Sequence, residues 1–146
     1  MWLDASTRYS LIRCEPSEHV LPWQVDIVAL ADNDGLTPGN PESFTVGRIL
    51  ADELRRFETT EWGDNVWDAA DSDSSGLEAA YASLLGPEGE FREQEFEGIA
   101  DPLVYLYRFV LHDAFASWRM AVLDGFCRLF SNDALIVAQH HTTWFS

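Results

Sequence analysis

Three histidines stand where the sequence could assemble a small catalytic or metal-binding site. His112 directly follows one long apolar stretch, and His140 and His141 directly follow a second one. If the two stretches are neighbouring parallel strands, their carboxyl ends meet at one sheet edge, where open α/β sheets bind ligands. His112, Asp113 and one further histidine could then form an acid–base or metal site. Consecutive strand residues point to opposite faces, so at most one of His140 and His141 could join His112. An ordinary structural or surface role is the simpler interpretation.

A second group of candidate ligands is a series of aspartates in the middle of the chain. Asp64, Asp68 and Asp71 recur at spacings of four and three residues, and Asp73 follows. On a helix this spacing places carboxylates on one face, where they could bind a divalent cation. The chain lacks the EF-hand loop pattern, so a solvated acidic face is the alternative. We therefore predict no metal site.

The motifs of familiar catalytic centres are missing from the sequence. It has no Gly-x-Ser-x-Gly, His-Glu-x-x-His, Cys-x-x-Cys or phosphate-loop pattern, and no lysine at all. Without lysine, Schiff-base chemistry is excluded. The spacing of Cys127 within a predicted helix indicates a core residue, and a disulfide between Cys14 and Cys127 is possible but not required. No catalytic residue can be named from sequence patterns.

Charge is the most distinctive property of the composition. The 146 residues carry 25 acidic and nine basic side chains, a formal net charge of −16. Residues 51–101 hold 15 of the acidic side chains and only three arginines. Such a surface repels nucleic-acid backbones and attracts cationic partners, such as a basic protein or a cationic amine substrate. Solubility alone is the alternative explanation.

The length and the apolar content predict one folded domain over residues 1–146. Apolar residues make up 47% of the chain, enough for a hydrophobic core. No run of about 18 apolar residues is present, so we expect no membrane span. The amino-terminal residues lack the pattern of a secretory signal, so we expect a cytoplasmic protein.

The first half of the chain favours antiparallel strands. Alternation predicts strands over Thr7–Arg13 and Trp23–Leu30, and in the second of these every other residue faces the core, beginning at Trp23. The segment Glu42–Thr60 starts with strand-forming residues and then takes helical spacing, so we predict a strand that becomes a helix near Gly47–Leu50. A short helical turn that buries Val66 and Trp67 should follow.

The middle and last thirds of the chain predict helices around one central strand. A helix should begin in the cap-rich segment 71–75 and end at Gly86-Pro87, followed by a charged loop. Pro102–Leu111 is apolar on both alternating faces, which predicts a central strand that is covered on both sides. Trp118, Val122 and Phe126 come next and form the apolar stripe of a helix. Ala134–Ala138 should then form a strand parallel to Pro102–Leu111. The fold class is therefore α+β with a mixed sheet, antiparallel strands first and a parallel strand–helix–strand unit last.

This layout resembles the GNAT acetyltransferase superfamily, with Leu103–Val137 matching its central strand, its acyl-CoA helix and the next strand. In that superfamily the joint reads Arg/Gln-x-x-Gly-x-Gly/Ala and its backbone N–H groups hold the pyrophosphate of coenzyme A. The equivalent run is Ala116–Ala121, in which Ala121 fits and Arg119 stands at the first glycine position. The resemblance implies acetyl-CoA as the cofactor, bound by the backbone at Val110 and Leu111 and by Ala121. It also implies a further helix and further strands after residue 139, which this sequence lacks.

Two functions are consistent with this interpretation. The first is a GNAT-like domain without catalysis, which binds or inhibits a basic partner by imitating a polyanion. The alternative is an acyl-CoA-dependent N-acyltransferase with an atypical cofactor loop and a cationic amine substrate. The strand at Ala134–Gln139 should form an open sheet edge, which would permit a homodimer.

Overall fold

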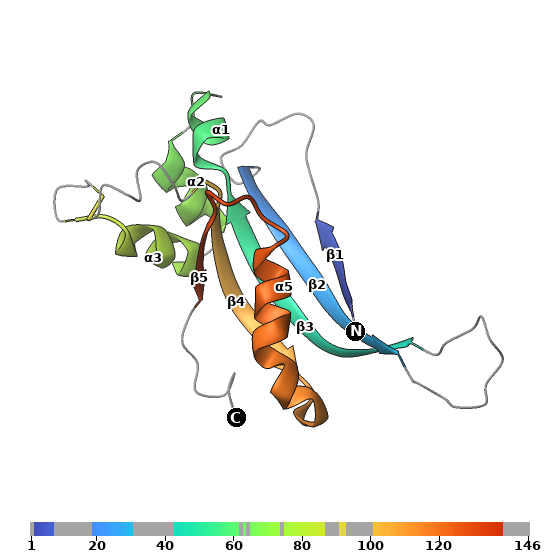
Figure 1. Ribbon diagram of the computed structural model, residues 1–146. Coiled ribbons are helices and arrows are strands. Elements are labelled where there is room, and N and C mark those ends of the chain that lie inside the picture. Colours follow the sequence, from blue (N-terminus) through green and yellow to red (C-terminus); the bar gives the residue numbers. More distant parts are fainter. Residues whose placement is uncertain are drawn as a thin grey trace, which may run out of the picture.

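A five-stranded mixed sheet organises the protein, as the computed structural model in Figure 1 shows. The structure describes residues 2–7, 19–30, 43–61, 63, 65–73, 75–86, 91–92 and 101–138. The strands are β1 (Trp2–Thr7), β2 (Val20–Leu30), β3 (Ser43–Leu54), β4 (Leu103–Leu111) and β5 (Leu135–Ala138), and they lie in the sheet in chain order. Neighbours pair antiparallel up to β4, whereas β4 and β5 pair parallel. The prediction of an α+β fold with a mixed sheet is therefore confirmed.

Helices occupy the two long connections of the sheet. Between β3 and β4 lie α1 (Arg56–Glu61), α2 (Val66–Asp73) and α3 (Ser75–Ser83), and between β4 and β5 lie the 3₁₀ helix η2 (Asp113–Trp118) and α5 (Arg119–Cys127). In Figure 1, α5 runs across one face of the sheet, while α1–α3 gather at one end of it. The asymmetry leaves part of the sheet's second face without a helix among the described residues.

The first face of the sheet is buried under α5. From Trp23 onward, every second residue of β2 enters this core, as the sequence predicts, together with residues of β3 and β4. Val122 and Phe126 are the buried residues of α5. Phe130, just after the helix, packs edge-on against Trp23 at 5.5 Å and against Phe126 at 5.3 Å between ring centroids. These aromatic contacts hold α5 against the sheet.

The second face is covered by α2 and α3, but only at the end where β3 finishes and β4 begins. Leu54, Leu103 and Tyr105 pack there against the helices, with Leu77 and Leu84 on the helical side. Asn65 begins α2 because its Oδ1 accepts the backbone N–H of Trp67 at 2.8 Å, which satisfies an otherwise unpaired helix donor. The helix predicted to begin in the segment 71–75 and to end at Gly86-Pro87 is confirmed as α3, with Leu77 and Leu84 buried.

The first two strands differ in how well the sequence predicts them. The strand Trp2–Thr7 was not predicted, and the strand predicted at Thr7–Arg13 lies, except for Thr7, outside the described residues. The strand predicted at Trp23–Leu30 is confirmed and begins earlier, at Val20.

The predicted change from strand to helix near Gly47–Leu50 is wrong. β3 stays extended to Leu54 because it hydrogen-bonds to β2 on one side and to β4 on the other. Pairing along both edges satisfies the backbone of residues 47–54, and this tertiary effect overrides a local helical spacing.

Two tryptophans that the sequence predicts to be buried are exposed. Trp67 in α2 is 38% exposed and Trp118 at the end of η2 is 51% exposed. Before α5 the chain turns as a 3₁₀ helix, which has about three residues per turn rather than 3.6. The α-helical spacing that places Val122 and Phe126 on one buried face therefore does not extend back to Trp118.

β4 is central, but it is covered on both faces only over its first half. Leu50 of β3 pairs with Arg108, whereas the next residue, Ala51, pairs with Leu106. Tyr107 is the extra residue of a β-bulge, which reverses the facing of the residues that follow it. Tyr107, Arg108 and Val110 are consequently exposed, so the predicted coverage of the whole strand on both sides is wrong.

The helices of the described residues include none that is long and apolar enough to cross a membrane.

We expect Gly47→Ala to lower the free energy of unfolding by about 1–3 kcal/mol, the usual cost of forcing atoms into a packed region. An added Cβ at Gly47 would collide with the backbone carbonyl of Val110 and lie 2.9 Å from Ile27 Cδ1. Chemical denaturation measures the change.

The control for this variant is Gly125→Ala in α5. An added Cβ there meets only the Leu3 side chain, with Cδ1 at 3.2 Å, and alanine gains up to about 1 kcal/mol of helix propensity. An equal loss of stability in both variants would contradict the explanation given for Gly47.

Candidate functional site

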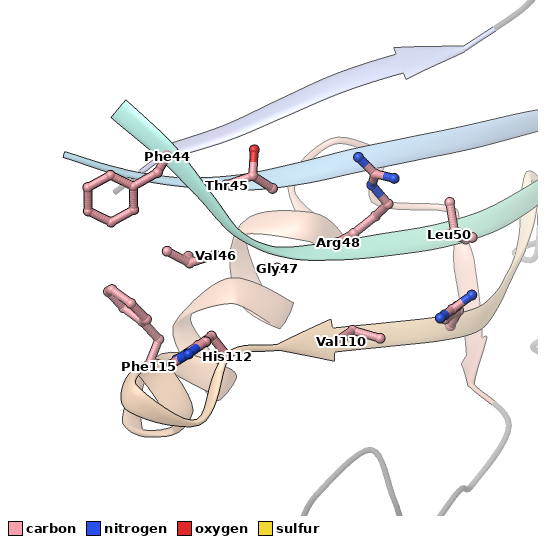
Figure 2. A pocket seen from close by; sticks show the side chains of 10 residues that line it. Phe44, Thr45, Val46, Gly47, Arg48, Leu50, Val110, His112 and Phe115 are labelled. Carbon is pink, nitrogen blue, oxygen red and sulfur yellow. The ribbon is translucent and has the colours of Figure 1, made fainter. Parts of the chain in front are cut away.

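An open groove of about 690 Å³ lies on the sheet face that points away from α5 (Figure 2). Its floor comes from β3, through residues 44–48 and Leu50, and from β4, through Arg108 and Val110. Phe115 of η2 closes one end beside Phe44. The volume falls in the range of small-molecule sites, about 300–1,000 Å³.

The strand register alternates charged and apolar residues along the floor of the groove. Arg48 lies opposite Val110, and Leu50 lies opposite Arg108. The two arginines are therefore diagonal neighbours on one face, at about 7–8 Å in a regular antiparallel pair. The bulges place them there, because Tyr107 is the extra residue of β4 and Val46 that of β3.

The charges of the two arginines are balanced differently. Arg48 donates from Nε to Asp26 Oδ1 at 2.6 Å, across the strand pair β2–β3. Arg108 is exposed, and within the described part of the chain its guanidinium meets no hydrogen-bond or ion-pair partner. The groove therefore holds one cation that is compensated by its neighbour and one that is not, on a chain of net charge −16.

His112 lines the end of the groove and caps η2. Its Nδ1 accepts the backbone N–H of Ala114 at 3.1 Å, and its own backbone N–H donates to the carbonyl of Val46 at 2.8 Å. Because Nδ1 is an acceptor in this contact, a neutral His112 carries its proton on Nε2. The contact makes this side chain the cap of η2.

The three positions predicted to bind a cofactor lie on different surfaces. Val110 is half exposed and lines the groove. Leu111, the next residue, packs against the core beneath α5. Ala121 is exposed on α5. The side chains of Val110 and Leu111 therefore face opposite sides of the sheet.

The segment Ala116–Ala121, which the sequence resemblance matched to a pyrophosphate loop, continues a helix without interruption. Trp118, the residue before α5, is itself helical, with φ −88° and ψ −1°, and the Arg119 N–H donates to the Ala116 carbonyl. An anion site at a helix start needs backbone N–H groups that have no partner within the helix. The first turn of the continuous helix lies instead at η2, where Asp113 brings a negative charge.

On the edge of β4 that faces β5, the described pairing covers the first half of the strand. The parallel pairing runs from Leu103 with Leu135 to Leu106 with Ala138, and Ala138 is the last residue that the structure describes. Beyond that point, β4 has no strand partner on this side among the described residues. Among the described strands, β5 is the last one of the sheet, as predicted, whereas a homodimer stays a prediction.

Of the other residues singled out from the sequence, those that the structure describes lie away from the groove. His140, His141, Cys14 and Asp64 lie outside the described residues, and Asp68 and Asp71 are exposed on α2. Where the structure describes the chain, no three or more His, Cys, Asp or Glu residues are grouped to hold a metal ion.

Cys127 is exposed at the end of α5 and forms no disulfide, so its predicted place in the core is wrong. Partial desolvation of the thiol and the neighbouring Asp124 carboxylate raise the pKa of Cys127 above its usual value. The thiolate is thus less populated than in an ordinary cysteine, and this disfavours a nucleophilic role.

The groove was missed by sequence reasoning, although one signal for it was visible. Arg108 is the only charged residue in the apolar stretch Pro102–Leu111, and a buried central strand should not contain an unpaired arginine. Phe44 and Arg48 carried no such signal, because their part of the chain was assigned to a strand that becomes a helix.

Comparison with protein-family models, with curated proteins and with solved structures finds no significant match to this chain.

The capping role of His112 predicts a specific pattern of stability. His112→Ala should lower the free energy of unfolding by about 1 kcal/mol, the typical contribution of a helix cap. His112→Asn should keep most of this contribution, because the asparagine side-chain oxygen can accept the same N–H. Chemical denaturation of both variants measures the difference. Equal losses in the two variants would contradict the capping role.

Proposed function

We propose that this protein is a non-catalytic binding module of GNAT-like fold whose acidic helices bind a basic protein partner. The observation that carries the proposal is a pair of neighbouring carboxyl groups, Asp71 of α2 and Glu78 of α3. A side-chain hydrogen bond with Asp71 raises the pKa of Glu78 above its usual value, and desolvation and the charge of Asp71 raise this pKa further. A lysine or arginine from a partner would relieve this repulsion.

The two arginines at the start of α1 already contact neighbouring groups. Arg55 bonds to Glu53 at 3.1 Å and lies 3.8 Å from Glu58. Arg56 is buried, with its guanidinium 4.8 Å from the ring centre of Phe91. The exposed carboxylates of Glu61, Asp68 and Asp71 therefore remain available to an external cation.

The absence of catalysis in this proposal is supported by the start of α5. The backbone N–H of Arg119 is used within the helix, and Asp113 occupies the first turn of η2. Both features disfavour a pyrophosphate at this point, because a phosphate needs unpaired donors and a positive potential.

An acyl-CoA-dependent N-acyltransferase is the second candidate, and the unit formed by β4, α5 and β5 favours it. β4 and β5 pair in parallel, with η2 and α5 between them in the chain, which is the strand–helix–strand order that the resemblance to GNAT acetyltransferases implies. In this candidate Val110, Leu111 and Ala121 bind acetyl-CoA.

The basic-partner proposal is tested with a peptide of alternating arginine and glycine residues, used as the probe. We expect it to bind the full chain at low salt and to weaken steeply as salt screens the charges. The double variant Asp71→Asn, Glu78→Gln should lose most of this affinity. Isothermal titration calorimetry over a range of salt concentrations measures it.

The matched control for that experiment is Asp124→Asn, Asp133→Asn, which removes the same formal charge from exposed positions outside α1–α3. It should retain most of the affinity. An equal loss in both double variants would show attraction by net charge alone and would contradict a binding surface on α2 and α3.

The acyltransferase candidate is tested with acetyl-CoA in a thermal-shift assay. For a non-catalytic module we expect no rise in melting temperature at millimolar acetyl-CoA, because a ligand stabilises only a fold that binds it. Arg119→Gly serves as the comparison and shows whether the side chain at the first glycine position blocks the site. A clear rise in the unmodified protein would contradict the non-catalytic proposal.

A further inference from the structure

The groove between β3 and β4 differs in chemistry from the rest of the molecule. It is apolar and locally cationic, on a chain that is acidic overall. It lies at the opposite end of the sheet face from α2 and α3, so it is separate from the surface proposed for a basic partner. We propose that the groove binds an amphipathic monocarboxylate, an acid with one carboxylate and an extended apolar tail.

The carboxylate is assigned to Arg108. Because Arg48 is compensated by Asp26 at 2.6 Å, Arg108 is the net positive charge of the groove. One uncompensated guanidinium matches one carboxylate, and it can donate two parallel hydrogen bonds to its two oxygens. A ligand with two or three negative charges would bring further negative charge close to the Asp26 carboxylate, with no second uncompensated cation in the groove to balance it.

Charges around the groove orient the ligand. Asp4 lies opposite Asp26 on β1, so the β1–β2 side of the sheet repels an anion. Asp113 in the first turn of η2 gives a negative potential near the Phe115 end. Both effects favour the carboxylate at the Arg108 end of the groove.

Apolar side chains provide a track for the tail. Leu50 and Val110 border the two arginines, and Phe44 and Phe115 stand at the far end (Figure 2). From Leu50 to Phe44 the strand advances by about 20 Å at 3.3 Å per residue. Val110 is 50% exposed and Phe44 is 46% exposed, so a tail lying here would remove apolar surface from water.

The test is a titration of the ¹⁵N-labelled full chain with decanoate, decanol and decylamine, each kept below its solubility limit and below the concentration at which it aggregates. We expect decanoate to shift the amide signals of residues 44–50 and 108–112, decanol to bind at least tenfold more weakly, and decylamine not to bind there. Acetate, which lacks the tail, should also bind far more weakly than decanoate. Equal affinities for decanoate and decanol, or for decanoate and acetate, would overturn the proposal.

Arg108→Met removes the charge and keeps an unbranched apolar side chain. It should weaken decanoate binding by about tenfold to a hundredfold, the value of a charge-assisted hydrogen bond. Arg128→Met is the matched control, because Arg128 is 78% exposed and pairs with Asp124 on α5, outside the groove. Decanoate affinity that is unchanged by Arg108→Met, or that falls equally in both variants, would overturn the assignment.

Val110→Glu provides a second variant at a half-exposed position, where a polar side chain remains in water. Its carboxylate would compete for Arg108, so decanoate binding should be lost while the dispersed amide spectrum of the folded protein is kept. Retained decanoate binding in this variant would overturn the proposed site. Neither variant alters Asp71 or Glu78, so its result is independent of the basic-peptide experiment.

Discussion

The hydrogen bonding of β3 along both of its edges is the constraint on which the structure depends. From Gly47 to Leu54 this strand pairs with β2 on one side and β4 on the other. Few other arrangements could satisfy so many backbone groups at once, because buried N–H and C=O groups must be paired. The pairing brings the antiparallel first half of the chain against β4, and through β4 against the parallel β5.

The two bulges in this pairing decide what each face of the sheet displays. An extra residue in a strand shifts the alternation of its side chains by one. With Val46 and Tyr107 as the extra residues, Ile49 and Phe109 enter the core beneath α5, while Arg48 and Arg108 emerge together on the other face. Because the described helices cover only one end of that face, the other end becomes a groove with two arginines on its floor. The groove is thus a consequence of strand register and of unequal helical cover.

The distribution of charge separates two surfaces. Acidic side chains concentrate on α1–α3, where Asp71 and Glu78 lie close enough to raise the pKa of Glu78, while the groove carries the uncompensated Arg108. One arginine does not change the negative electrostatic potential around a protein with net charge −16. Any attraction of an anion by Arg108 is therefore local to the groove. The same separation explains why a basic protein and a small carboxylate are proposed for different parts of one sheet face.

The pattern of apolar residues by itself determined the fold class, the alternation of β2, the helix at α3 and the order strand–helix–strand at the end of the chain. These features depend on periodicity, which is local and can be seen in the sequence. Only the tertiary structure decided that β3 remains extended to Leu54, that Trp118 is exposed, and that Arg48 and Arg108 share a groove. Each of these depends on pairing between segments far apart in the chain, where a shift of one residue reverses the face that a side chain occupies. Arg108 could be noticed in the sequence, but its neighbours could not, because register is a property of two strands together.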